Sequence, residues 1–481
     1  MWPDISLRSM AREGGGTLAR AITRLRQPFH DLARFYAEGA ARVAIDTDRR
    51  IYADLAHRIE MLRSDLELVL VAIETAGDRA PAPRAVATVG VPGPRRRVLC
   101  VVQRYGRGGA EHLCQMVAER LATRHDVTVY TTCALSDRTW ANELPAGAEV
   151  VNGVRVVRFP TARSRDPDAA RVEVPQDPVA QRDADLAWLA AQGPHAPDLR
   201  DAIRRDAPAF DANLFFTYLY EPTVLGLQQA SDRSILIPTA HDEDALRAAT
   251  IVETFQAAHY LIFLTRAERE LVVRTVQEIS APHAIASVGM GGIVTGDGAR
   301  FRDRHGLGAE TVFLYVGRVD AGKGCADLVH HWRASALPSS RLVLVGENRL
   351  GLSAEDGILP LGYVADDERA DAYAGADVFV QPSALESLSL VLLEAWQYGL
   401  PALVNQRSAV LLDHVRQAQG GLYFADADDF GAIARYLIAR PDERRRLGVN
   451  GATYVARQYT WERFDPIWDA AIEAVAPRRS Q

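Results

Sequence analysis

Residues 97–132 read RVLCVVQRYGRGGAEHLCQMVAERLATRHDVTVYTT and contain the pattern on which the fold prediction rests. The apolar run 97–102 is typical of a buried strand, a glycine-rich loop follows it, and residues 110–124 have the apolar spacing of a helix. A second apolar run, 127–132, predicts another strand. Two parallel strands joined by a helix form a βαβ unit, so this segment predicts a parallel sheet with helices packed on it.

The same alternation of strand-like and helix-like segments continues along the chain. Further apolar runs that predict strands occur within 212–220, 234–242, 260–274, 311–318, 341–347, 377–383 and 401–405. A glycine-rich stretch, 287–299, divides this series into two halves. We therefore predict an α/β protein with two doubly wound Rossmann-like domains facing a cleft, the first at 97–290 and the second at 291–455.

The segment before residue 97 has a different pattern. From Tyr52 to Ile73, apolar residues recur at alternating spacings of three and four with charged residues between them, which is the seam of a short coiled coil. We expect a helical extension at 1–80, a linker at 81–96, and a homo-oligomer formed through residues 52–73. An apolar stripe at 18–32 with flanking arginines leaves two alternatives open, peripheral contact with an anionic membrane or packing against protein.

Composition narrows the class of protein. Of the 481 residues, 48% are hydrophobic and 24% charged, as in a globular protein rather than a disordered or membrane-spanning one. The net charge of −7 argues against a nucleic-acid-binding protein, because such proteins present a basic face to the phosphates. Four widely spaced cysteines, and no long apolar segment, favour a cytoplasmic protein that is at most peripheral at the inner membrane face.

All but one of the lysine and arginine positions in the chain are arginines. Of the 55 lysines and arginines, only Lys323 is a lysine. Lysine is a compact point charge, whereas arginine is a broad planar group, so the surviving lysine is expected where arginine does not serve. The alternative is that Lys323 is a lysine by chance and has no special role.

The first glycine-rich turn does not fit the dinucleotide-binding fingerprint. The pattern G-x-G-x-x-G beginning at Gly106 requires glycine at position 111, which is Glu111, and no acidic residue ends the second strand. A dehydrogenase is therefore disfavoured. Gly108 and Gly109, at the start of a helix, offer close backbone approach to a phosphate or a sugar hydroxyl, with a purely structural turn as the alternative.

A second glycine-rich turn, VGRVDAGKG at 316–324, follows a predicted strand of the second half. It is not a P-loop, because Gly324 stands where Ser or Thr would follow the lysine. Arg318 and Lys323 lie at the carboxyl end of the strand, where α/β folds bind ligands, and are expected to converge on a diphosphate. Two surface charges at a strand end are the alternative.

Residues 381–401, QPSALESLSLVLLEAWQYGLP, contain two glutamates eight residues apart. With Glu386 at the start of a helix, Glu394 would lie about 12 Å along it. Paired carboxylates of glycosidases stand about 5 to 9.5 Å apart, so this spacing favours separate contacts with a sugar and a ribose. The alternatives are a helix-terminus acid at Glu386 and a solvent-facing charge at Glu394, although an acid in the apolar run LVLLEAW needs a partner.

This segment resembles the E-x7-E signature of the retaining GT-B glycosyltransferases of family 4, and VGRVDAGKG is similar to that family's phosphate-binding strand end. GGAE at 108–111, TAHDED at 239–244 and YTWERF at 459–464 match in type and order. The resemblance covers about residues 97–470. It implies two Rossmann-like domains with a C-terminal helix, 456–476, that crosses back to the first. Ser389, where many members have glycine, and GENR at 346–349 depart from the pattern.

The resemblance implies a role for each candidate residue. Arg318 and Lys323 would hold the donor diphosphate, Glu394 the ribose hydroxyls and Glu386 the transferred sugar. His241 would face that sugar across the cleft together with Asp242, unless it is a structural histidine. The remaining expected contacts are backbone groups of Leu388, Ser389 and Leu390 toward sugar or phosphate, the segment Gly362, Tyr363 and Val364 near the base, and Gly108 and Gly109 from the first domain.

These expectations define a retaining transfer of a sugar from a nucleotide diphosphate donor to a glycan or lipid-linked acceptor, in surface polysaccharide synthesis. We expect no cofactor and no metal, because Arg318 and Lys323 supply the positive charge and the acidic pairs Asp46/Asp48 and Asp426/Asp428 lie elsewhere in the sequence. Two alternatives stay open, a nucleotide-sugar epimerase of the same fold and a non-catalytic scaffold of a polysaccharide assembly complex.

Overall fold

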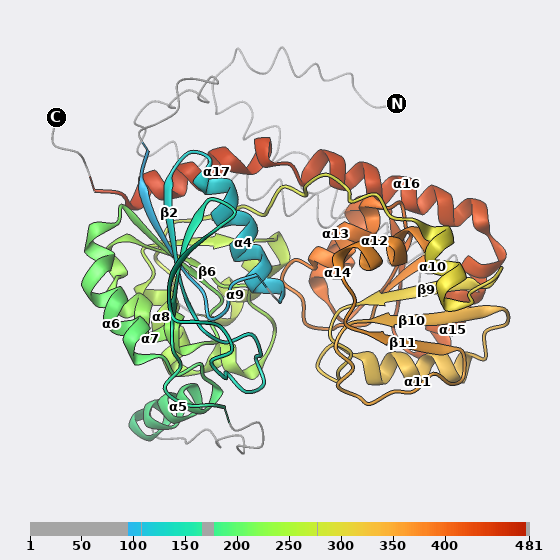
Figure 1. Ribbon diagram of the computed structural model, residues 1–481, viewed down its shortest axis with the longest axis horizontal. Helices are drawn as coiled ribbons and strands as arrows, with labels where there is room; N and C mark the ends of the chain where they lie inside the picture. The colour runs from blue at the N-terminus through green and yellow to red at the C-terminus, as the bar shows by residue number, and fades with distance from the viewer. Residues whose placement is uncertain (1–94, 107, 166–177, 277, 478–481) are drawn as a thin grey trace, which may run out of the picture. The chain divides into compact units, whose positions relative to one another are not determined.

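The computed structural model describes residues 95–106, 108–165, 178–276 and 278–477 (Figure 1). The described residues fall in one compact unit, residues 93–481. The predicted coiled coil at 52–73, the stripe at 18–32 and nearly all of the predicted linker lie outside the described residues.

The first sheet has eight strands in the order β3-β4-β2-β1-β5-β6-β7-β8. Neighbouring strands are parallel except β3 and β4, which are antiparallel. The central strands are buried at nearly every position, as expected for a parallel sheet with helices on both faces. The strands are β1 (Arg97–Val101), β2 (Asp126–Thr132), β3 (Gly147–Val151), β4 (Val154–Phe159), β5 (Ala212–Phe216), β6 (Ser234–Ile237), β7 (Tyr260–Phe263) and β8 (His283–Ile285).

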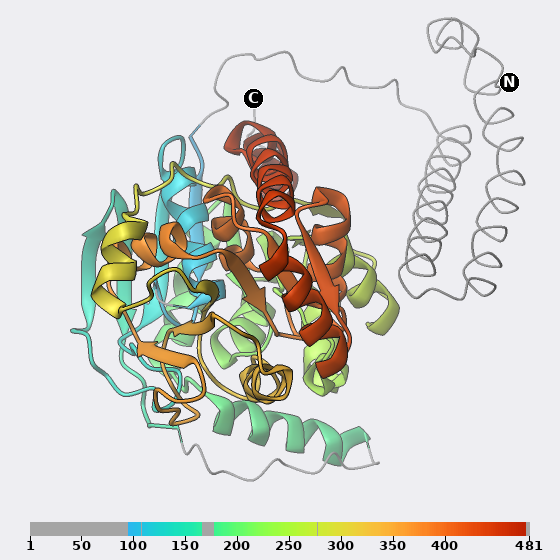
Figure 2. The same cartoon turned by 90° about the vertical axis from the view of Figure 1, so that its right-hand side faces the viewer.

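The second sheet has six strands, all parallel, in the order β11-β10-β9-β12-β13-β14. Figure 2 presents this sheet to the viewer with helices on both of its sides. The order places β9 beside β12, so the loops that follow these two strands emerge side by side. The strands are β9 (Thr311–Val316), β10 (Ser340–Val345), β11 (Ile358–Gly362), β12 (Val378–Gln381), β13 (Ala402–Asn405) and β14 (Gly421–Phe424).

Many of the helices connect successive strands, as the βαβ pattern predicts, whereas α15 (Ala427–Ala439), α16 (Pro441–Gln458) and α17 (Trp461–Val475) follow the last strand, β14. In the first domain the helices are α4 (Gly109–Ala122), α5 (Pro178–Gln192), α6 (Pro197–Asp206), α7 (Glu221–Gln229), α8 (Ala249–Ala257) and α9 (Arg266–Thr275). The later ones, up to β14, are α10 (Gly298–His305), α11 (Cys325–Ser335), α12 (Asp366–Gly375), α13 (Leu390–Gln397) and α14 (Ala409–Ala418). The predicted α/β fold with two Rossmann-like domains is confirmed.

The C-terminal helix α17 packs against β6, β7 and β8 of the first sheet, whereas α16 packs against elements of the second (Figure 1). Trp468 is 1% exposed and donates its indole N–H to the carbonyl of Ser287 at 3.0 Å. Three arginines of the first domain form ion pairs with acids of α17. Both apolar packing and ion pairs therefore hold α17 against the first domain.

Because Trp468 fills a buried site, Trp468→Ala should lower the free energy of unfolding by about 3–5 kcal/mol. Urea unfolding followed by far-UV circular dichroism measures this loss. Val449→Ala in α16, where the side chain is 58% exposed, is the control and should leave the midpoint unchanged. Equal midpoints for the wild type and Trp468→Ala would contradict the proposed packing of α17.

Candidate functional site

Two strands of the second sheet end in glycines that bring their loops together. β9 is followed by Gly317 and β10 by Gly346, with φ of 148° and 138°. A Cβ atom on Gly346 would overlap the carbonyl oxygen of Gly317, so the strand ends approach as closely as glycine permits. This carboxyl edge is where doubly wound sheets bind ligands, and it carries Arg318 and Lys323.

Hydrogen bonds hold the loop that carries the two cations. The buried Tyr315 donates its hydroxyl to the carbonyl of Arg318 at 2.7 Å, and the carboxylate of Asp320 accepts the backbone N–H of Lys323 at 2.8 Å. Gly324, at φ 73°, packs against the carbonyl of Pro382, where any Cβ would clash. The loop is thereby pressed against the segment that follows β12.

Lys323 and Glu386 meet at this contact. Lys323 Nζ lies 2.8 Å from Glu386 Oε1, and the side chain of Glu386 is only 8% exposed. A carboxylate this buried is costly unless it is paired, and Lys323 is its partner. The structure thus brings together two candidate residues that are 63 positions apart in sequence.

The prediction that Glu386 begins a helix is wrong. α13 begins at Leu390, and Glu386 lies in the preceding loop. The hydroxyl of Ser383 hydrogen-bonds with the backbone of Leu385, which competes with helical hydrogen bonding. Ser389, immediately before the helix, is left-handed at φ 65°. The separation of about 12 Å, calculated for a continuous helix, therefore does not apply.

Glu394 lies on α13 and has the polar partner that its apolar surroundings require. Tyr373 of α12 donates its hydroxyl to Glu394 Oε2 at 2.9 Å, and the ring of Tyr373 stacks on Tyr398 at 5.1 Å. Burial lowers the pKa of nearby Arg369, but the negative charge of Glu394 and other acidic groups outweighs burial and raises it. A carboxylate with one hydroxyl donor retains acceptor capacity for further hydroxyl groups.

A helix begins between Glu386 and Glu394, at the same edge of the sheet. Leu388 is buried, and its carbonyl lies 3.1 Å from His414 Nε2. Ser389 adopts the left-handed conformation for which glycine is favoured, at the position where the family resemblance expects glycine. Leu390 begins α13, whose first N–H groups have no intrahelical acceptor and point along the positive end of the helix dipole.

The segment expected near the base follows β11. Gly362 pairs with Val345 of β10, and its carbonyl accepts the N–H of Gly346 at 2.8 Å. Tyr363 is 71% exposed beyond this strand end, whereas Val364 packs against the core of the second domain. The structure places both residues at the carboxyl edge that carries Arg318.

In the first domain, His241 follows β6 and lies beside Glu243. His241 Nδ1 is 3.5 Å from Glu243 Oε1, which also accepts the hydroxyl of Tyr218 at 2.7 Å. Asp242 instead forms an exposed ion pair with Arg247 at 2.9 Å. The chain bends after His241, where the N–H of Glu243 donates to the carbonyl of His241 at 2.9 Å, and it is Glu243 rather than Asp242 that lies against the His241 ring; a sugar contact by Asp242 stays a prediction.

Glu243 connects this group with the second domain. Burial would raise the pKa of Glu243, but hydrogen bonds from His241 and Tyr218 and the positive charge of Lys323 lower it overall. The surroundings of Glu243 thus favour its charged form. The motif TAHDED contained it, but the sequence held no signal that distinguished Glu243 from Asp242.

The first glycine-rich turn is held by a buried carboxylate. Glu111 of α4 accepts the side-chain amide of Gln103 at 2.9 Å and Arg104 Nη2 at 2.7 Å. Gly108, at φ 107°, lies where a Cβ would collide with that carboxylate, so a structural reason for this glycine exists. Nothing in the described structure lies within 4 Å of a Cβ built on Gly109, which leaves its backbone open to a ligand.

Asp137, in the loop after β2, was absent from the sequence-based candidates. Its carboxylate lies 2.7 Å from Arg318 Nη1 and 2.7 Å from Arg349 Nη2. Burial would raise the pKa of Asp137, but the hydrogen bond from Arg349 and the charges of Arg104 and Arg318 lower it to about 2. Arg318 therefore forms an ion pair with a carboxylate of the first domain, and Arg349 forms an ion pair with the same carboxylate.

Glu268 anchors the backbone that carries His241. Its carboxylate is 1% exposed and accepts the N–H of Ala240 and the N–H of Leu264, each at 2.6 Å. These two residues follow β6 and β7, so one side chain ties two strand ends together. Burial raises the pKa of Glu268 to about 8, with the backbone hydrogen bonds offsetting only part of the effect.

The raised pKa of Glu268 gives a pH dependence with a defined sign. The group titrates at 4.5 in its ordinary state and at about 8 in the fold, so the folded chain holds the proton more tightly. Its contribution to the free energy of unfolding is fully present below pH 4.5 and is lost as the pH rises through about 8.

Glu268→Gln removes this titration, so its unfolding free energy should fall less steeply than that of the wild type between about pH 5 and 8. Urea denaturation across this range measures the slopes. Glu270→Gln, at an exposed position of the same helix, is the control and should keep the wild-type slope. Parallel curves for the wild type and Glu268→Gln would refute the assignment.

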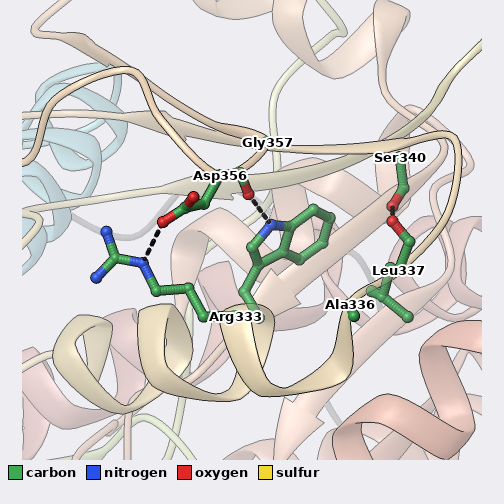
Figure 3. A pocket seen from close by; sticks show the side chains of 7 residues that line it. Arg333, Ala336, Leu337, Ser340, Asp356 and Gly357 are labelled. Carbon is green, nitrogen blue, oxygen red and sulfur yellow. Dashed lines mark hydrogen bonds and ion pairs between the residues drawn. The ribbon is translucent and has the colours of Figure 1, made fainter.

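A cavity of about 440 Å³ lies away from these residues (Figure 3). It is formed at the end of α11 and the amino-terminal ends of β10 and β11, by Trp332, Ala336, Ser340, Asp356 and Gly357 among others. Its polar groups are paired with one another, including the indole N–H of Trp332 with the Asp356 carbonyl at 3.1 Å (Figure 3). The cavity is at the sheet edge opposite to Lys323 and is not part of the candidate site.

No group of three or more His, Cys, Asp or Glu side chains in the described part of the chain is arranged to hold a metal ion. Within the same residues, none of the helices combines the length and apolar character needed to span a membrane.

Comparison with known proteins identifies a family match in the second domain and relatives that cover part of the chain. Residues 310–440 match the family described as Glycosyl transferases group 1. Sulfoquinovosyl transferase SQD2 of Arabidopsis thaliana is 27% identical over 171 residues, covering 34% of this chain and 33% of that protein. D-inositol 3-phosphate glycosyltransferase of Segniliparus rotundus is 29% identical over 199 residues, covering 36% and 42%. The chain thus spans less than half the length of these two relatives.

Solved structures share the fold over most of the described chain. Sucrose-phosphate synthase from Thermosynechococcus elongatus has a TM-score of 0.59 at 18% identity, covering 79% of this chain and 98% of that chain. Anabaena HepE in complex with UDP-glucose has a TM-score of 0.61 at 15% identity, covering 79% and 100%. The likeness confirms the predicted GT-B arrangement of two Rossmann-like domains.

Proposed function

We propose that this chain, whose residues 310–440 form a glycosyl transferases group 1 domain, transfers a sugar from a nucleotide diphosphate donor to a glycan or lipid-linked acceptor. The observation that carries the proposal is the ion pair between the only lysine of the chain and the buried Glu386, at the ligand-binding edge of the second sheet. The second domain then binds the donor and the first domain the acceptor.

Positive charge at this edge is suited to a leaving diphosphate. As the bond between the anomeric carbon and the diphosphate breaks, negative charge accumulates on the phosphate oxygens. Lys323 and Arg318, held by the hydrogen-bonded loop after β9, stabilise that charge electrostatically. We propose that these two side chains supply the charge stabilisation without a metal ion or a cofactor.

The two glutamates have separate tasks in this proposal. Glu394 accepts hydrogen bonds from the ribose hydroxyls, for which it has acceptor capacity beside Tyr373. Glu386, oriented by Lys323, accepts hydrogen bonds from hydroxyls of the transferred sugar. His241, with Glu243 beside it, faces the sugar from the first domain, and the N–H groups at the start of α13 approach sugar or phosphate.

We propose retention of the anomeric configuration. In this mechanism the acceptor hydroxyl attacks the face from which the diphosphate departs, and a phosphate oxygen accepts its proton. No enzymic nucleophile is then required, and Glu386 positions the sugar without exchanging a proton. The anomeric configuration of the product, read by NMR, tests this step, since an inverted product would exclude it.

Lys323→Ala should reduce the transfer rate by about 1,000-fold, because the leaving diphosphate loses a preorganised cation. Release of nucleoside diphosphate from a panel of nucleotide sugars measures the rate. Arg333→Ala is the matched control, since Arg333 is a paired cation in the last turn of α11, where it forms ion pairs with Glu355 and Asp356 at the end of the helix far from Lys323. Transfer by Lys323→Ala at the wild-type rate would sink the assignment.

Glu394→Ala should act chiefly on donor affinity. Loss of charge-assisted hydrogen bonds to the ribose, worth about 1.5–3 kcal/mol, should raise the KM for the donor about 10- to 100-fold with a smaller change in kcat. Initial rates at varied donor concentration separate the two constants. Glu443→Gln, at an ion pair of α16, serves as the control. A fall in kcat at unchanged KM would place Glu394 elsewhere in the reaction.

Donor turnover with and without acceptor separates this proposal from its alternatives. The transferase releases nucleoside diphosphate in proportion to the acceptor that is glycosylated. An epimerase alters the donor or releases free sugar without acceptor, and a scaffold does neither. The complex of HepE with UDP-glucose makes UDP-sugars the first donors to test.

A further inference from the structure

The charge cluster formed by Asp137, Arg318 and Arg349 is unexplained by the roles assigned so far. Arg318 Nη1 and Arg349 Nη2 approach different oxygens of the same carboxylate, each at 2.7 Å. Each arginine also has an acidic neighbour on its own loop, Asp320 at 3.2 Å and Glu347 at 2.7 Å. Asp137 is the member of the cluster that comes from the first domain.

Arg349 is placed beside Arg318 by backbone contacts that do not involve Asp137. The loop after β10 bonds to Val319, with the N–H of Arg349 donating to the Val319 carbonyl at 3.0 Å and the N–H of Val319 donating to Glu347 at 2.9 Å. Removing Asp137 would therefore leave two guanidinium groups side by side with mutual repulsion. Moreover, Arg349 Nε is buried without a hydrogen-bond partner in the described part of the chain.

Asp137 is held in place as firmly as the arginines. Its loop is fixed by Glu143, which accepts the N–H groups of Leu135 and Ser136 at 2.9 and 3.0 Å. Arg104, which is paired with Glu111, donates to the Leu135 carbonyl at 2.7 Å. The carboxylate of Asp137 is 12% exposed, so it is delivered to the arginines by a structured loop rather than by a free surface side chain.

We propose that Arg349 is a second arginine of the donor diphosphate site and that Asp137 is the counter-ion which the diphosphate displaces. Two adjacent guanidinium groups match the several oxygens of a diphosphate, to which arginine binds in a bidentate manner. This inference rests on the proposed function, because the diphosphate is that of the donor. Donor binding then breaks the ion pairs between Asp137 and the second domain, and losing the donor restores them.

The low pKa of Asp137 means that the carboxylate competes with the diphosphate throughout the working pH range. Removing the carboxylate of Asp137 and removing the guanidinium of Arg349 should therefore have opposite effects on the binding of a nucleoside diphosphate. Asp137→Asn removes the competitor and should tighten nucleoside diphosphate binding about tenfold, whereas Arg349→Gln removes a ligand-binding cation and should weaken it about tenfold. Damage to a purely structural bridge would change affinity in the same direction in both variants.

Isothermal titration of the full chain with UDP, GDP and ADP, each alone, tests the proposal. Asp377→Asn is the matched control, since Asp377 pairs with Arg302 at 2.6 Å away from the site, and its affinity should equal that of the wild type. Weaker or unchanged binding by Asp137→Asn overturns the proposal while the proposed function stands.

Arg349→Gln decides alone if Asp137→Asn does not fold, because wild-type or tighter binding by Arg349→Gln overturns the proposal. Failure of every nucleoside diphosphate to bind the wild type would instead remove the proposed function, and the role of Asp137 with it. A wild type that binds no nucleoside diphosphate thus rejects the proposed function. A wild type that binds, with variants that depart from the expected affinities, rejects only the roles proposed for Asp137 and Arg349.

Discussion

The ion pair between Lys323 and Glu386 depends on the order of strands in the second sheet and fixes the geometry of the site around it. Because β9 and β12 are neighbours, the loops that follow them meet, although the two residues are 63 positions apart. Gly324 permits the contact at φ 73°, and the hydroxyl of Tyr315 holds the loop behind it. One pairing of strands thus places the charges on which the proposed chemistry relies.

Every cation assigned to the diphosphate is paired with a carboxylate. Lys323 is paired with Glu386, and Arg318 and Arg349 share Asp137. Lys323 and Arg349 are partly buried, and such cations would be costly without counter-ions, so the acids offset this cost. The same acids also set a selectivity, because a ligand must carry enough negative charge to compete with them.

The fold and part of the site were accessible from sequence for physical reasons. Strands buried on both faces and glycines at strand ends leave local patterns, and the single lysine marked one position without any structural knowledge. The start of α13 at Leu390 could not be predicted from the sequence. The hydroxyl of Ser383 bonds to the backbone of Leu385 and competes with helix formation, and the spacing of apolar residues does not reveal such a local hydrogen bond. Asp137 was missed because Arg349 lies 212 residues away, and only the packing of two domains brings them together.

The central claim is that the carboxyl edge of the second sheet binds a nucleoside diphosphate between its cations and Glu394. A crystal structure of the full chain with bound UDP or GDP tests it most directly. The account predicts phosphate oxygens within hydrogen-bond distance of Arg318 and Lys323, and ribose hydroxyls on Glu394. A nucleotide bound elsewhere, for example in the cavity beside Trp332, with these three side chains unchanged, would contradict the account.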